Sequence, residues 1–261
     1  MTPDSSFTQA GDVFIGTDFA RGPWSADHCH GGPPTGIIAR ACEHAVPHQR
    51  LTRLTVELSR PVPLAGFTVE TNVLRSGRKT SLVAATLTGI DGRVCVTATA
   101  LHLLASDHAA LPTTEWDTPR RSDATKGPPP VRSLAHGLPG FFDGTQLLFD
   151  PGSAPGPGPC TLWMRTVPLL PTEPMSPFQR VCPLADSGNG ISSNGDFTDF
   201  SPINPDLTVS LHRDPVGEWI GSQATSRWEP NGIGLAEALL FDEIGPIGRA
   251  TQTLLVSSNR S

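Results

Sequence analysis

Asp186 is the first residue whose type and setting could do chemistry. It lies four residues after Cys182 and one after Ala185, both of which belong to an apolar pattern with helical spacing. A carboxylate at the border of such a stripe is partly withdrawn from water and can act as a general base. The turn-rich segment that follows, 187–190, equally suits an aspartate that only hydrogen-bonds to backbone.

Gln252 is a second polar residue placed among apolar ones. The alternation of residues 247–256 predicts a strand in which Gln252 shares a face with Ala250 and Leu254. Burying a carboxamide there costs free energy unless its donors and acceptor are paired. A glutamine with a purely structural role would be paired in the same way. In the first half of the chain we expect Thr99 at the corresponding position. Because the two halves then differ at a position where a polar group points inward, we expect one working site rather than two.

Asn204 completes a set of three candidate catalytic residues. It precedes Pro205, which favours an extended conformation, just ahead of a predicted strand at 206–212. Taken alone, it is an ordinary residue at the start of a strand. Together with Asp186 and Gln252 it provides a carboxylate and two amides in one half of the chain. Such a set can hold and deprotonate one water, so the sequence predicts neither a metal site nor a cofactor.

The segment His30-Gly31-Gly32 is the best candidate for substrate binding. His30 could donate to a substrate carbonyl, and the amides of Gly31 and Gly32 at a helix start favour an oxyanion. A plain turn that enters a helix would have the same sequence. A basic turn at Arg75, Arg78 and Lys79 could meet a phosphate, although a solvated loop is the ordinary interpretation.

The composition and spacing exclude several other classes. The 25 acidic and 19 basic residues give a net charge of −6, without the basic stripe of a nucleic-acid-binding protein. Five widely spaced cysteines without a C-x-x-C pair fit reduced thiols. The spacing G-x-S-x-G of a serine hydrolase and the third glycine of a dinucleotide fingerprint are missing. No apolar run approaches the roughly 20 residues of a membrane span. With a polar amino terminus, we expect a cytoplasmic protein without membrane or nucleic-acid partners.

The chain consists of two similar halves. Residues 54–60 match residues 207–213 at five of seven positions with an offset of 153, and two later segments follow in the same register. Residues 105–160 hold 10 of the 27 prolines, which is typical of a linker, with one strand at 141–149. The predicted division is a repeat at 1–106, a Pro/Gly-rich linker at 107–140 and a second repeat at 141–261.

Each half is predicted to begin with a helix and to continue as an antiparallel meander. Pro33 and Pro34 in the first half, and Ser176-Pro177 in the second, are helix-start signals. Alternation predicts strands at 51–58, 66–75, 80–89, 93–104, 206–212, 218–228, 234–242 and 247–256. This order favours an α+β fold, in which two copies pair edge to edge and protect each other's exposed strands.

Several motifs, taken together, resemble those of a known family. They are Trp24 and His30-Gly31-Gly32-Pro33-Pro34 in the first half, and Trp163-Met164-Arg165, Leu184-Ala185-Asp186-Ser187-Gly188-Asn189-Gly190, Ile203-Asn204-Pro205-Asp206 and Arg249-Ala250-Thr251-Gln252 in the second. In this order and spacing the chain resembles acyl-CoA thioesterase-like proteins of the double hotdog fold. The resemblance implies two tandem repeats, each an antiparallel sheet wrapped around one long helix, that form one continuous sheet. Proteins of this fold commonly self-associate, so we expect a homo-oligomer.

The resemblance also implies an activity. In type II acyl-CoA thioesterases of this superfamily, an Asp, a Gln and a Thr or Ser hold the hydrolytic water. Position by position, these fall on Asp186, Gln252 and Asn204, so an amide stands where a hydroxyl is usual. The first expectation is hydrolysis of an acyl-CoA or acyl-carrier thioester, with Asp186 as general base.

Two alternatives remain open. Because Asn204 lacks a hydroxyl, the chain could bind acyl thioesters with weak or no hydrolysis. A hydratase on the same fold is less well supported, since such enzymes pair an Asp with a His on one segment and no His lies near Asp186.

Overall fold

The computed structural model describes residues 4–108, 110–114, 116–130, 137–154 and 156–259. The first half of the chain contains a short 3₁₀ turn η1, one helix α1 and strands β1 to β6. Their bounds are β1 Phe7–Ala10, β2 Val13–Gly16, η1 Asp18–Ala20, α1 Gly32–Ala45, β3 Arg50–Leu58, β4 Phe67–Ser76, β5 Thr80–Gly89 and β6 Val94–Leu103.

The second half contains two helices and strands β7 to β14. The bounds are η2 Arg121–Asp123, β7 Thr125–Lys126, η3 Phe141–Gly144, β8 Thr145–Phe149, β9 Cys160–Thr166, α2 Pro177–Ala185, α3 Gly188–Ser192, β10 Phe200–Ile203, β11 Asp206–Leu211, β12 Ile220–Trp228, β13 Ile233–Phe241 and β14 Pro246–Ser258. No helix in the described ranges has both the length and the apolarity needed to cross a bilayer.

All the described strands belong to one continuous sheet. Its order is β1-β2-β4-β5-β6-β3-β11-β14-β13-β12-β9-β8-β7, and β10 pairs with β14 outside this path. The two halves meet where β3 pairs antiparallel with β11, with Thr55 opposite Thr208. The Thr208 hydroxyl donates to the Thr55 hydroxyl at 3.0 Å. These threonines are equivalent residues of the repeated sequence, so a local two-fold relates the halves, and the predicted double hotdog fold is confirmed.

The eight strands predicted from alternation are confirmed to within two residues at each end. Phe141–Gly144, the start of another predicted strand, forms a 3₁₀ turn, and only Thr145–Phe149 is extended. The turn forms because the Gly140 N–H donates to the Asp143 carboxylate at 2.7 Å. The predicted linker 107–140 contains β7, which pairs with β8. Residues 109, 115 and 131–136 of that linker lie outside the described residues.

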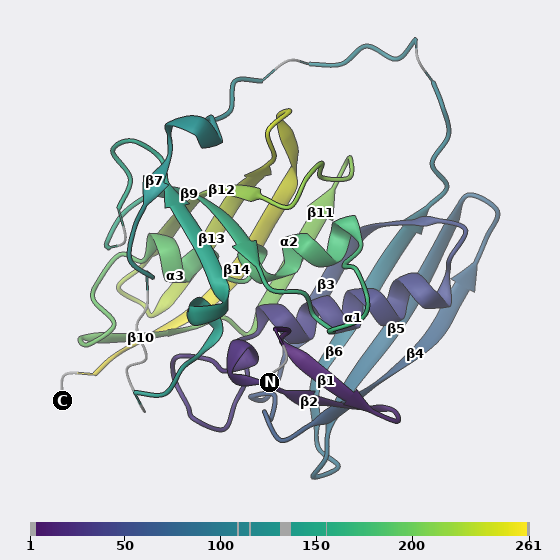
Figure 1. Cartoon of the computed structure of the whole chain (residues 1–261), viewed down its shortest axis with the longest axis horizontal. Coiled ribbons are helices and arrows are strands. Elements are labelled where there is room, and N and C mark those ends of the chain that lie inside the picture. The colour runs from purple at the N-terminus through teal and green to yellow at the C-terminus, as the bar shows by residue number, and fades with distance from the viewer. Residues whose placement is uncertain (1–3, 109, 115, 131–136, 155, 260–261) are drawn as a thin grey trace.

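The helices lie together on the concave side of the sheet (Figure 1). The predicted stripe of α2, Phe178, Val181, Cys182 and Ala185, is buried, and Gln179, Pro183 and Leu184 are buried as well. One hydrophobic cluster runs through both halves. Helix α1 packs against α2, and polar contacts fix this pair. Arg40 donates twice to Glu173, and Glu43 accepts from Ser176 and Gln179 at the start of α2.

The second helix is not one long helix as predicted but two pieces, α2 and α3. Pro183 inside α2 has no N–H to donate. Beyond it, the Asn189 N–H donates at 3.1 Å to the side-chain oxygen of Gln252, and Gln252 donates at 2.9 Å to the carbonyl of Asp186. A side chain from β14 therefore replaces partners that a continuous helix would supply from its own backbone.

Candidate active site

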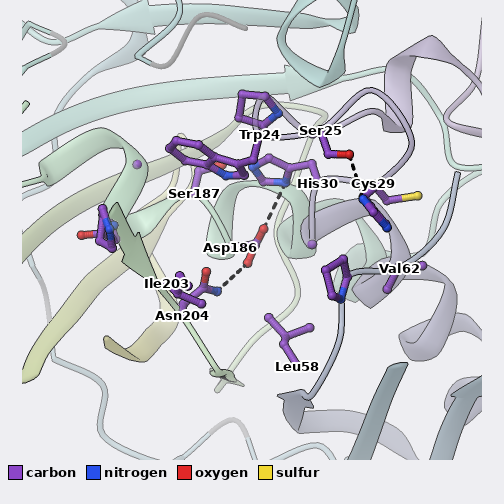
Figure 2. Close-up of a pocket in the computed structure, with 18 of the residues that line it drawn as sticks. Trp24, Ser25, Cys29, His30, Leu58, Val62, Asp186, Ser187, Ile203 and Asn204 are labelled. Atoms are coloured by element: carbon purple, nitrogen blue, oxygen red, sulfur yellow. Dashed lines mark hydrogen bonds and ion pairs between the residues drawn. The ribbon is translucent and has the colours of Figure 1, made fainter. Parts of the chain in front are cut away.

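A pocket of about 390 Å³ lies between the two halves. Its wall combines the loop before α1 and the end of β3 with the α2–α3 junction and the segment between β10 and β11 (Figure 2). Among the predicted site residues, Asp186, Asn204, His30 and Gly31 line it. Gln252 lies behind the wall, in contact with Asp186. Residues far apart in sequence thus meet at one place.

Asp186 is the C-cap of α2, and its carboxylate is nearly enclosed, with the side chain 6% exposed. The Asn204 amide donates to one carboxylate oxygen at 3.0 Å, and His30 Nδ1 lies 3.0 Å from the other. These contacts are drawn in Figure 2. A carboxylate oxygen has two lone pairs, and the oxygen beside His30 has one partner, so it has capacity for a water. The arrangement can hold a water against a fixed, accessible base.

Gln252 is 1% exposed, on the inward face of β14 as predicted. Its carboxamide bridges the break between the helices, accepting from the Asn189 N–H and donating to the Asp186 carbonyl. A second, longer contact of 3.5 Å runs from the amide to the Asp186 carboxylate. In this structure Gln252 holds Asp186 rather than lining the pocket.

The predicted equivalence of Gln252 with Thr99 is wrong by one residue. Thr99 pairs with Thr55 and Ala84, whereas in the second half Thr251 holds the matching pairings with Thr208 and Glu237. Ala100, which is fully buried, therefore occupies the position of Gln252. The shift arises because the β13–β14 hairpin is one residue shorter than the β5–β6 hairpin. The first half has no polar group there, as the single-site expectation requires.

The contact of His30 with Asp186 is the largest difference between the sequence-based expectation and the structure. No histidine lies near Asp186 along the chain, yet His30 from the other half touches its carboxylate. The ring is 11% exposed and stacks on Phe141, with centroids 4.3 Å apart. Nδ1 also lies 3.2 Å from the Gly32 N–H, from which it could accept only without its proton. Because Nδ1 faces the Asp186 carboxylate, this ring nitrogen is not placed to donate to a substrate carbonyl.

Gly31 and Gly32 are required by close approach of α1 to α2. A Cβ on Gly31 would lie 3.0 Å from the Asp186 carboxylate, and one on Gly32 would lie 2.7 Å from Pro183 Cα. The start of α1 supplies few donors, because Pro33 and Pro34 have no N–H. The expectation of an oxyanion site made from several amides at this helix start is therefore reduced to the N–H groups of Gly31 and Gly32.

Family models match both halves of the chain. Residues 20–103 match the acyl-CoA thioesterase N-terminal domain, and residues 107–256 match the acyl-CoA thioesterase C-terminal domain. The chain belongs to the acyl-CoA thioesterase family. None of the curated proteins matches it significantly in sequence.

Solved structures show the same fold at low sequence identity. The acyl-CoA thioesterase II TesB2 of Mycobacterium marinum has a TM-score of 0.65 at 14% identity, with 96% of this chain and 95% of that one covered. The tesB protein of Mycobacterium avium subspecies paratuberculosis has a TM-score of 0.68 at 16% identity, with coverage of 95% and 94%. A hot dog fold protein of unknown function from Alicyclobacillus acidocaldarius reaches 0.70 at 19%, with coverage of 100% and 97%.

The pocket of this thioesterase family member has apolar walls. Trp24 and Phe197, from opposite halves, meet edge to face with ring centroids 5.3 Å apart, and Phe142, Val62 and Ile203 add further apolar surface. Cys29 also lines the pocket, but burial raises the pKa of its thiol, so the thiol stays protonated and is a poor nucleophile. The walls suit an apolar group.

Arg60 lines the pocket and carries a positive charge. Comparison with Arg213, the equivalent residue of the second half, shows that Arg60 lacks a matching acidic partner. The two Nη atoms of Arg213 donate to the two oxygens of the buried Asp242 carboxylate, and its Nε donates to the Pro246 carbonyl. Arg60 makes the matching contact, to the Val94 carbonyl, but Gly89 stands where the aspartate would be. Arg75, Arg78 and Lys79, for which a solvated loop is the ordinary interpretation, do not line the pocket.

Asn189 is a pocket residue that the sequence alone did not single out. It lies three residues after Asp186 and is 8% exposed. Its side-chain oxygen accepts from the Trp228 indole N–H at 3.2 Å and from the Ser226 hydroxyl at 3.4 Å. The helical spacing from Asp186 is the one sequence signal that could have pointed to it.

Proposed function

We propose that this chain hydrolyses acyl-CoA or acyl-carrier thioesters with a water activated by Asp186. The observation that carries the proposal is the nearly enclosed Asp186 carboxylate, which lines an apolar pocket and is held by Asn204 on one oxygen and His30 on the other. Membership of the acyl-CoA thioesterase family supports the reaction class.

The reaction needs one water and no other reactant. Asp186 takes a proton from the water as the water oxygen attacks the thioester carbonyl carbon. The tetrahedral oxyanion then collapses, the carbon–sulfur bond breaks, and the thiolate leaves. The proton held by Asp186 passes to the thiolate, which yields a carboxylic acid and a free thiol.

Asn204, Gln252 and His30 orient the base in this proposal. The Asn204 amide already donates to Asp186, which leaves its oxygen free to accept from the attacking water. Gln252 fixes the backbone of Asp186 from behind. His30 lies against the second carboxylate oxygen and lines the pocket together with Gly31, while Gly32 packs against Pro183 behind it.

The pocket favours a substrate with an apolar acyl group and an anionic carrier. The aromatic and aliphatic walls accept the acyl group, and Arg60, which has no acidic partner comparable to Asp242, faces the phosphates that CoA and a carrier-protein arm share.

The second candidate is a protein that binds acyl thioesters without efficient hydrolysis. Asn204 favours it, because an amide that donates to the base lacks the single rotatable proton of a hydroxyl.

Free-thiol release from short-, medium- and long-chain acyl-CoAs tests the proposal. We expect turnover that follows enzyme concentration, with a lower KM for an acyl-CoA than for the same acyl group on N-acetylcysteamine, which has no phosphate. If every acyl-CoA stays intact while acyl-CoA raises the melting temperature, the binding function replaces the proposal.

A further inference from the structure

We propose that the Asn189 side-chain amide is the donor that polarises the thioester carbonyl and stabilises the tetrahedral oxyanion. This inference rests on the proposed hydrolysis and assigns a catalytic role to a residue outside the Asp186, Asn204 and Gln252 set.

The orientation of the Asn189 amide is fixed by its partners. An indole N–H can only donate, so the atom 3.2 Å from the Trp228 indole nitrogen must be the amide oxygen. The Ser226 hydroxyl lies on the same oxygen. The NH₂ group therefore lies on the opposite side of the carboxamide and donates to none of the described residues. Asn189 lines the pocket, and its amide nitrogen is not one of the fully buried, unpaired side-chain atoms of the described residues.

The position of Asn189 relative to Asp186 suits a carbonyl between them. Asp186 and Ser187 both have helical backbone angles, so residues 186 and 189 share a face. Side chains three apart on a helix have Cβ atoms roughly 5–6 Å apart. In the proposed complex, the thioester carbonyl lies between these two side chains, with its carbon toward the water on Asp186 and its oxygen toward Asn189. Gln252 binds the backbone of both residues and keeps their separation fixed.

The other candidate donors are limited. His30 turns Nδ1 toward the Asp186 carboxylate, 3.0 Å away, and the prolines at the start of α1 have no N–H. The Gly32 N–H points toward His30 Nδ1, 3.2 Å away, and Gly32 does not line the pocket, so Gly31 offers the remaining N–H at this helix start that could assist Asn189. A fixed amide NH₂ in a nearly enclosed pocket stabilises developing negative charge without reorganisation, and such stabilisation accounts for much of the rate enhancement in many acyl-transfer enzymes.

Kinetics of Asn189→Asp and Asn189→Ala test the role. The Asp variant keeps an oxygen for Trp228 but loses the NH₂ group, and the Ala variant loses both. We expect kcat to fall about 100-fold in each with KM little changed. Trp228→Phe, which leaves the amide free to rotate, should lower kcat less. Asn72→Ala, on the exposed part of β4, is the control and should match the wild type.

A spectroscopic readout separates this inference from the hydrolysis itself. In the Asp186→Asn background, the infrared stretch of a ¹³C-labelled thioester carbonyl should move to lower wavenumber on binding, and Asn189→Ala should abolish that shift. This shift can be measured even if the wild type does not turn over acyl-CoA. A shift that persists without Asn189, or an unchanged kcat in both Asn189 variants, would overturn the assignment.

Discussion

At the scale of single residues, Gln252 shows how one side chain can define a site that it does not line. Its carboxamide interrupts the second helix, holds Asp186 by its carbonyl and holds Asn189 by its N–H. Alternation along β14 is enough to predict that Gln252 is buried. Its partners could not be predicted, because they lie more than sixty residues away in the sequence. The same holds for His30, whose contact with Asp186 joins two halves of the chain.

Replacing Gln252 with Ala tests this bridging role. The Asp186 carbonyl and the Asn189 N–H would lose their partner in a buried place, which costs about 1–3 kcal/mol of unfolding free energy. We expect that loss in urea unfolding, together with a fall in kcat of at least about tenfold, since each 1.4 kcal/mol in the barrier is roughly a factor of ten. Thr251→Ala, on the opposite face of the same strand, should change neither. Wild-type kcat in Gln252→Ala would show that Asp186 is positioned without the carboxamide.

At the scale of elements, the regular parts were predictable and the interruptions were not. The long strands β3 to β6 and β11 to β14 alternate clearly, so their bounds follow from the sequence. The hairpin β1–β2 and strands β9 and β10 were not predicted. Strands β1, β2 and β10 have only four residues each, and the first five residues of β9 are all buried, so β9 lacks the alternation that marks β11. The break between α2 and α3 depends on a side chain from another element, which helical periodicity cannot register.

Asp242, between β13 and β14, is expected to make the folded protein less stable at acidic pH. Burial alone would raise the pKa of Asp242, but hydrogen bonds from Arg213 and from the Val216 and Ile244 N–H groups together lower it below its ordinary 3.8. A lowered pKa means that this carboxylate stabilises the fold above pH 3.8, and that the contribution is lost as the pH falls through the lower, folded-state value.

Replacing Asp242 with Asn should therefore cost about 3 kcal/mol of unfolding free energy at pH 7. The difference from wild type should shrink as the pH falls below 3.8. Urea unfolding at a series of pH values measures both effects. Asp91→Asn, an exposed residue of the equivalent hairpin, is the matched control and should stay within about 0.5 kcal/mol. A difference between Asp242→Asn and wild type that is constant with pH would contradict the ion-pair explanation.

At the scale of the whole molecule, two copies of one fold form one pocket. The sheet is continuous through the paired Thr55 and Thr208, so the halves are held in a fixed register. The two halves carry different residues at equivalent positions of the repeat, and these differences affect the pocket. Ala100 replaces Gln252 in the first half, and Gly89 replaces Asp242 and leaves Arg60 at the pocket. One half thus supplies the base and the other supplies His30, Gly31 and a cation.

The central claim, that Asp186 activates the water that cleaves a thioester, is tested most directly by free-thiol release from acyl-CoA by wild type and Asp186→Asn side by side. The substitution keeps the size of the side chain and an oxygen for Asn204, so the melting temperature should change little. We predict turnover by the wild type and a loss of at least about 1000-fold in kcat for the variant, with acyl-CoA still bound. Equal thiol release by the two proteins would contradict the account.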